Sequence, residues 1–242
     1  MIVNYNRSGW EIITQRAHGL LAAQLAGQWK VSERPGRWVE TLIAIAGHDD
    51  AEVELDGENL LTPRGGPLNF SMKAFDEPHC QRVSRFTIAK SRYIALLTSM
   101  HMDFLYHKEE KENPAAAAFL KAQRKLQTAW RRGLHITRPE AEKIYCLLEW
   151  CDALSLLLCR RDVQPEHRSV EIGIGPDNRS YQLVRQQDNR LTIDPWPFEP
   201  ASFTVHYEYR ELKKLQFKSS AEFRAAFVDA SVKEQEWKLV NL

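Results

Sequence analysis

The chain has 242 residues, with 33 basic and 32 acidic side chains, so its formal charge of +1 gives no electrostatic reason to bind a nucleic-acid polymer. No apolar run approaches the roughly 18 residues that cross a bilayer, and the first residues lack the pattern of a signal peptide. We therefore expect a cytoplasmic protein without membrane contact. The length and the lack of a linker predict a single domain over residues 1–242.

The first half of the chain predicts a hairpin, two helices and a long loop. Alternating apolar residues around Arg7-Ser8-Gly9 indicate a hairpin over 1–14. Apolar residues at helical spacing predict helices over about 15–30 and 37–49, separated by the break at Pro35-Gly36. Residues 50–78 are rich in glycine and proline, and we expect them to form an ordered loop that walls a cleft.

The second half predicts further helices and then strands. One helix covers about 81–110, one begins at Asn113-Pro114, and one is capped by Thr137. After residue 159 the pattern changes to period two, which predicts strands near 170–174, 181–184, 191–193 and 203–207. We predict a mainly α fold of the α+β class: a helical core over about 15–161, then a small antiparallel β-meander and a C-terminal helix over about 168–237.

Polar side chains interrupt the apolar faces of three predicted helices. His18 and Asp152 each lie within an apolar stripe, and His48-Asp49 closes an apolar run. A bare carboxylate in such a position costs several kcal/mol, so it needs a counter-charge. A divalent metal bound by imidazole and carboxylate would satisfy these residues together, and a buried His/Asp hydrogen-bond cluster is the alternative.

The order of these residues resembles the HD superfamily of metal-dependent phosphohydrolases. The resemblance implies an HD-domain-like helical core, with a metal bound by His18, His48, Asp49 and Asp152. Longer stretches of the chain resemble the bacterial family known as domain of unknown function 3891. They include Ile12-Ile13-Thr14-Gln15, His48-Asp49-Asp50, Leu97-Thr98-Ser99-Met100-His101, Cys151-Asp152-Ala153-Leu154-Ser155-Leu156 and Pro195-Trp196-Pro197-Phe198.

Three further side chains are candidates near this site. His101 faces the core of its helix and would support a ligand, shuttle a proton, or bind a second metal bridged by Asp49; a hydrogen-bonded core histidine is the alternative. Glu149 precedes Asp152 by one helical turn and is either a general acid or base or half of a surface salt bridge. Asp50 either supports a ligand histidine or caps its own backbone. The catalytic candidates are thus Asp49, His101 and Glu149.

The resemblance implies a phosphohydrolase that acts on a small phosphorylated or nucleotide-like substrate with a divalent metal (Mn, Co, Mg, Zn or Fe). An HD-type di-iron oxygenase and a non-catalytic metal-binding scaffold are the alternatives. For phosphate recognition the candidates are Arg16, Arg37, Arg82 and Lys90. The sequence does not indicate an oligomeric state.

Overall fold

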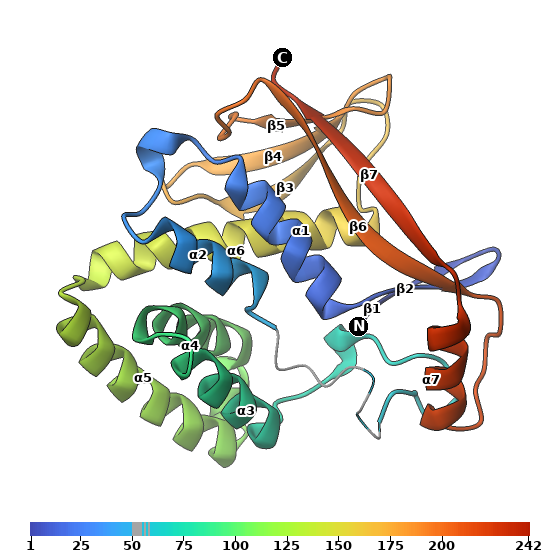
Figure 1. The fold of residues 1–242 in the computed structure, drawn as a ribbon, viewed down its shortest axis with the longest axis horizontal. Helices are drawn as coiled ribbons and strands as arrows, with labels where there is room; N and C mark the ends of the chain where they lie inside the picture. Colours follow the sequence, from blue (N-terminus) through green and yellow to red (C-terminus); the bar gives the residue numbers. More distant parts are fainter. Residues whose placement is uncertain (50–54, 56, 58) are drawn as a thin grey trace.

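A computed structural model describes residues 1–49, 55, 57 and 59–242 (Figure 1). Seven strands form one sheet in the order β1-β2-β6-β7-β5-β4-β3. Among the described strands, only β5 and β7 pair in parallel; the other neighbours are antiparallel. The strands are β1 (Ile2–Asn6), β2 (Gly9–Ile13), β3 (Ser169–Ile174), β4 (Ser180–Arg185), β5 (Leu191–Asp194), β6 (Ser202–Leu212) and β7 (Val232–Val240).

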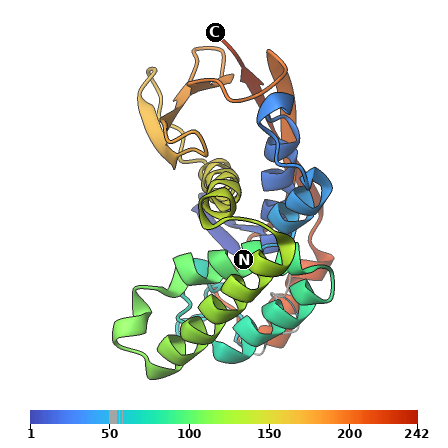
Figure 2. The ribbon, with the colours of Figure 1, turned by 90° about the vertical axis from the view of Figure 1, so that its left-hand side faces the viewer.

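The helices form two groups around this sheet. Figure 2 shows the sheet arching over α6, with α1 against its β6 side, and α3, α4 and α5 form a separate layer below. The helices are α1 (Gln15–Gly27), α2 (Trp38–Ala46), α3 (Glu77–Ile88), α4 (Arg92–Tyr106), α5 (Pro114–Leu134), α6 (Arg138–Arg160) and α7 (Ser220–Asp229). Short 3-10 turns lie at η1 (Val31–Glu33), η2 (Phe70–Met72) and η3 (Glu109–Lys111). Within the described residues, no helix has both the length and the apolar character needed to cross a bilayer.

The concave face of the sheet holds an aromatic core. The rings of Trp29, two residues beyond α1, and Trp150 on α6 meet edge to face at 5.1 Å, and Trp150 lies 5.3 Å from Tyr181 on β4. Phe198, in the segment between β5 and β6, packs on both tryptophans. These side chains are almost fully buried. Burying large aromatic surface fixes α1 and α6 against each other and against the sheet.

The prediction of a mainly α fold with a small meander on an HD-like helical core is wrong. Strands β3, β4 and β5 do form an antiparallel meander, but β7 separates β5 from β6, and β6 pairs with the N-terminal hairpin. Trp10 lies opposite Leu212, across 202 residues of sequence. The predicted helix over 81–110 is also wrong in its continuity, because it divides into α3 and α4. The break is fixed by Ser91, whose Oγ accepts a hydrogen bond from the backbone N of Ile94 at 3.2 Å.

Candidate metal centre

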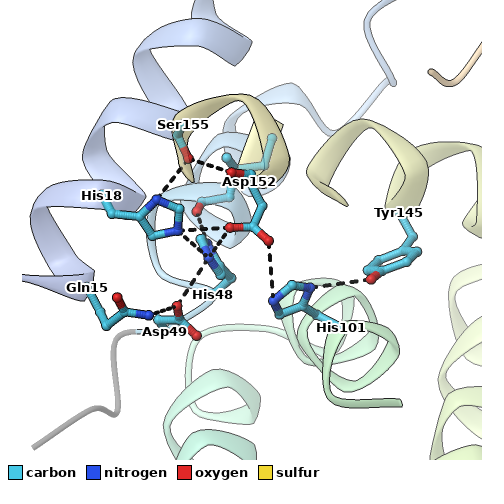
Figure 3. Close-up of polar contacts among 9 residues, drawn as sticks. Gln15, His18, His48, Asp49, His101, Tyr145, Asp152 and Ser155 are labelled. Carbon is cyan, nitrogen blue, oxygen red and sulfur yellow. Dashed lines mark hydrogen bonds and ion pairs between the residues drawn. The ribbon is translucent and has the colours of Figure 1, made fainter. Parts of the chain in front are cut away.

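Four helices bring five polar side chains together. His18 lies on α1, His101 on α4 and Asp152 on α6, while His48 and Asp49 form the turn that follows α2 (Figure 3). The predicted second helix therefore ends earlier than expected, at Ala46. The three histidines are buried, and Asp152 is 8% exposed.

α1 reaches the end of α2 because Gly19 has no side chain. Gly19 follows His18 directly, and a Cβ added there would overlap the carbonyl oxygen of Ala46. Ala46 is the last residue of α2 and lies two residues before His48. The glycine therefore permits the close approach that places His18 beside His48.

The donor atoms of His18, His48 and Asp152 form a compact triangle. His18 Nε2 lies 2.8 Å from Asp152 Oδ1, His48 Nε2 lies 3.3 Å from the same oxygen, and the two Nε2 atoms are 3.2 Å apart. Asp49 Oδ2 lies 3.4 Å from His48 Nε2 and belongs to a second group of donors, with His48 and His101. Donor atoms about 2.1 Å from one ion, at tetrahedral or octahedral angles, lie roughly 3.0 to 3.4 Å apart. His18, His48 and Asp152 therefore fit one divalent ion.

The other nitrogen of each of these histidines is already hydrogen-bonded. His48 Nδ1 donates to the carbonyl oxygen of Ile45 at 2.7 Å. His18 Nδ1 lies 2.8 Å from Ser155 Oγ; because Ser155 donates its own proton to the backbone oxygen of Asp152, His18 Nδ1 is the donor. Both Nε2 atoms thus face the same carboxylate oxygen, where each offers a lone pair to a metal once it carries no proton. This is the arrangement that orients histidines as metal ligands.

The carboxylates of Asp49 and Asp152 favour a positive charge within the cluster. Burial alone would lower the pKa of His48, but the carboxylates of Asp49 and Asp152 outweigh it and raise this pKa to about 10. Despite burial, hydrogen bonds from His18 and His48 hold the pKa of Asp152 well below its usual range. Burial lowers the pKa of His101 to about 4, which keeps this imidazole neutral at pH 7.

His101 is adjacent to the triangle but not part of it. Its Nε2 lies 4.0 Å from Asp152 Oδ2, the carboxylate oxygen that does not contact His18, and its Nδ1 lies 3.3 Å from the hydroxyl of Tyr145. His48, Asp49 and His101 form a second group of donors within 4.8 Å of one another. His48 offers one free nitrogen, so an ion at His101 would share a carboxylate with the first site.

A cavity of about 210 Å³ opens beside the cluster. The clustered histidines and aspartates form one wall, and Phe70, Ser71 and Lys73 form part of the other, together with His79 from α3. The prediction that the loop over 50–78 walls the cleft is therefore confirmed for Phe70, Ser71 and Lys73. Its first part, including the candidate Asp50, lies outside the described residues.

Most of the chain matches a known protein family. A family model described as a protein of unknown function, DUF3891, matches residues 1–214. The chain belongs to the DUF3891 family. No curated protein and no solved structure matches the chain. The predicted membership of DUF3891 is thus confirmed, whereas these comparisons give no support to the resemblance to HD-type phosphohydrolases.

The DUF3891 match includes every residue of the predicted metal set, and the structure brings all of them together. Glu149 differs. Burial, followed by the charge of Asp152, raises its pKa, but it is not among the described residues that line the cavity. Its catalytic role stays a prediction. None of the four basic residues considered for phosphate recognition lines the described part of the cavity. Two other side chains, Lys73 and His79, line it instead.

Three residues that support the ligands were not predicted from the sequence. Gln15 donates from Nε2 to Asp49 Oδ2 at 2.7 Å, Ser155 accepts from His18, and Tyr145 contacts His101 (Figure 3). Helical spacing could have found them. Gln15 precedes His18 by three residues, Ser155 follows Asp152 by three, and Tyr145 precedes Asp152 by seven, so each shares a helix face with a ligand.

Proposed function

We propose that this protein is a metal-dependent hydrolase of a small phosphorylated substrate, with a divalent ion bound by His18, His48, Asp49 and Asp152. The observation that carries the proposal is the pair of Nε2 atoms that face one carboxylate oxygen at ligand spacing. Imidazole nitrogen and carboxylate oxygen form a donor set that suits Mn, Co, Zn or Fe, and Mg if the carboxylates dominate.

The chemistry would be divided between the ion and the surrounding side chains. A divalent ion here would polarise a phosphoryl oxygen and lower the pKa of a bound water. Gln15 orients the Asp49 carboxylate, which can accept a proton from the attacking water. His101 is neutral because burial lowers its pKa to about 4, and it can bind or relay that proton.

The cavity supports a small anionic substrate. Lys73 and His79 lie on its wall and would bind a phosphoryl group electrostatically. A volume of about 210 Å³ suits a compact ester. The order of the ligands along the chain, which resembles that of HD-type phosphohydrolases, is a further reason to choose phosphate esters.

Metal analysis followed by a phosphatase and nucleotidase panel tests the proposal. The purified protein is expected to bind a divalent metal and to hydrolyse a small phosphomonoester. Asp152→Asn is expected to abolish both properties. Asp162→Asn, the same change at an exposed position just beyond α6, is the matched control. Protein that binds no divalent metal after reconstitution contradicts the proposal.

The second group of donors favours one alternative, a di-iron oxygenase. An ion held by His101 and a shared carboxylate would make a two-metal centre. Iron bound at two equivalents, an optical band and oxygen uptake would identify this activity. Tight metal binding with neither hydrolysis nor oxygen uptake would identify a non-catalytic scaffold.

A further inference from the structure

A groove of about 480 Å³ lies between α4, α5 and the first turns of α6. Its volume is within the range of about 300 to 1,000 Å³ that is usual for small-molecule sites. Met100, Phe104 and Tyr145 contribute apolar surface to it, and Phe104 is 43% exposed. Thr128 and Gln127 add a hydroxyl and an amide. The groove thus combines an aromatic surface with polar groups.

One of the three guanidinium groups that line the groove has no carboxylate partner among the described residues. Asp103 is held by the guanidinium of Arg124, which also binds Glu110 on its other side. Glu142 pairs with Arg138 across an exposed contact of 2.7 Å. Arg131, in the last turn of α5, is half-buried and has no side-chain partner among the described residues. A half-buried guanidinium without a carboxylate favours an anion.

The groove shares a wall with the metal centre. Tyr145 lines the groove, and its hydroxyl lies 3.3 Å from His101 Nδ1 (Figure 3). Phe104 also lines the groove, and its ring is stacked on the His101 ring with centroids 6.2 Å apart. The Nε2 of the same imidazole faces Asp152 Oδ2. A ligand that displaces Phe104 or Tyr145 would therefore move His101 relative to the carboxylate.

We propose that this groove is a binding site for a small organic anion, which places its apolar body on Phe104 and Tyr145 and its charge at Arg131, and that its occupancy changes metal affinity through His101. The binding site is independent of the proposed function. The linkage rests on it, because it requires the metal centre. Linkage is reciprocal, so the metal must change anion affinity by the same factor.

Titration of the chelator-treated protein with phenylphosphonate tests the site. This probe is an aromatic dianion that a phosphatase does not hydrolyse. Arg131→Gln is expected to weaken its binding about tenfold or more, because a charge-assisted contact is lost. Arg132→Gln removes the same charge from the neighbouring, exposed position and is expected to bind like the original protein. Absence of saturable binding, or equal affinities in the two variants, would overturn the proposal.

The metal dissociation constant, measured with and without saturating phenylphosphonate, tests the linkage. A shift of about fivefold or more is expected in the original protein. It should vanish in Arg131→Gln, which excludes direct binding of the probe to the ion. Tyr145→Phe keeps the ring in the groove but removes the contact with His101, so it should bind the probe with a reduced shift. An unchanged metal affinity in the original protein would overturn the linkage; failure to bind metal would overturn the proposed function and leave the probe titration interpretable.

Discussion

The Nε2 atoms of His18 and His48 lie 3.2 Å apart and face the same oxygen of Asp152. Each imidazole uses its Nδ1 proton elsewhere, on Ser155 and on the carbonyl of Ile45. Two lone pairs this close repel each other unless a cation lies between them. A metal ion or a proton must therefore occupy this position, and the two can be told apart by experiment.

Metal binding is expected to stabilise the fold. An ion that binds only the folded chain adds about 2.7 kcal/mol when its concentration is one hundred times its dissociation constant. Thermal unfolding with metal and with chelator measures the difference as a shift in Tm. Asp152→Asn should remove most of the shift, since it removes the central ligand. Equal Tm values after verified metal loss would contradict a metal in this cluster.

Metal affinity is expected to rise with pH. The pKa of His48 is about 10 in the metal-free chain, because Asp49 and Asp152 outweigh the effect of burial. A metal ion must displace this proton, so the affinity should increase about tenfold for each pH unit between pH 7 and 9. Calorimetry in buffers of different ionisation enthalpy would count the proton released. Binding without proton release would indicate that His48 is not a ligand.

The stability of the metal-free chain should show the opposite trend above neutral pH. The folded-state pKa of His48 is raised from about 6.5 in the unfolded chain to about 10. This group therefore stabilises the fold fully below pH 6.5, and the contribution is lost as the pH rises towards 10. Urea unfolding in chelator at pH 6.5 and 9 measures the loss. A His48→Gln variant should lack this component.

Ser155→Ala is expected to weaken metal binding by about ten- to one-hundredfold. The hydroxyl accepts the Nδ1 proton of His18 and donates to the backbone of Asp152, so it fixes the orientation of one ligand and the carbonyl of another. Thr192→Val is the control, because it removes a buried hydroxyl bonded to the backbone of Val240 in the sheet. An equal loss of affinity in both variants would point to a general structural effect.

Gly19→Ala is expected to destabilise the chain by about 1 to 3 kcal/mol and to weaken metal binding, because the added methyl must push Ala46 away from α1. The matched control is Gly27→Ala at the end of the same helix, where a Cβ would meet nothing within 4 Å. That variant should be unchanged or slightly more stable. Urea unfolding and metal titration of the two variants make the comparison.

The ligands were predictable because each one breaks a local pattern. A carboxylate such as Asp152 within an apolar helix face is costly, and this cost is visible in the sequence alone. Their supporting residues were missed because Gln15, Ser155 and Tyr145 are ordinary residues on a helix. Lys73 was missed because it lies in a loop, whose path no periodicity describes, and His79 because it lies in the first turn of α3, directly after that loop.

The sheet was poorly predicted because its pairing is not local. The strand β7 contains four charged residues among nine and no clear alternation, so nothing in its own sequence distinguished it from the end of a helix. The pairing of β2 with β6 joins opposite ends of the chain. Apolar residues at helical spacing continue across Lys90 into α4. This continuous spacing gives no sign of the helix break at the N-cap Ser91. Where local sequence preference and long-range strand pairing disagree, the pairing determines the secondary structure.

The position of β7 has a consequence for how the protein is made. This strand is the last in sequence yet the fourth of seven across the sheet. A chain emerging from the ribosome can assemble β1-β2-β6 and β3-β4-β5 as separate pieces, but each keeps an open edge until residues 232–240 are released. Open edges can pair with other chains. Release of β7 therefore closes these two inner edges at once by joining the two pieces into one sheet.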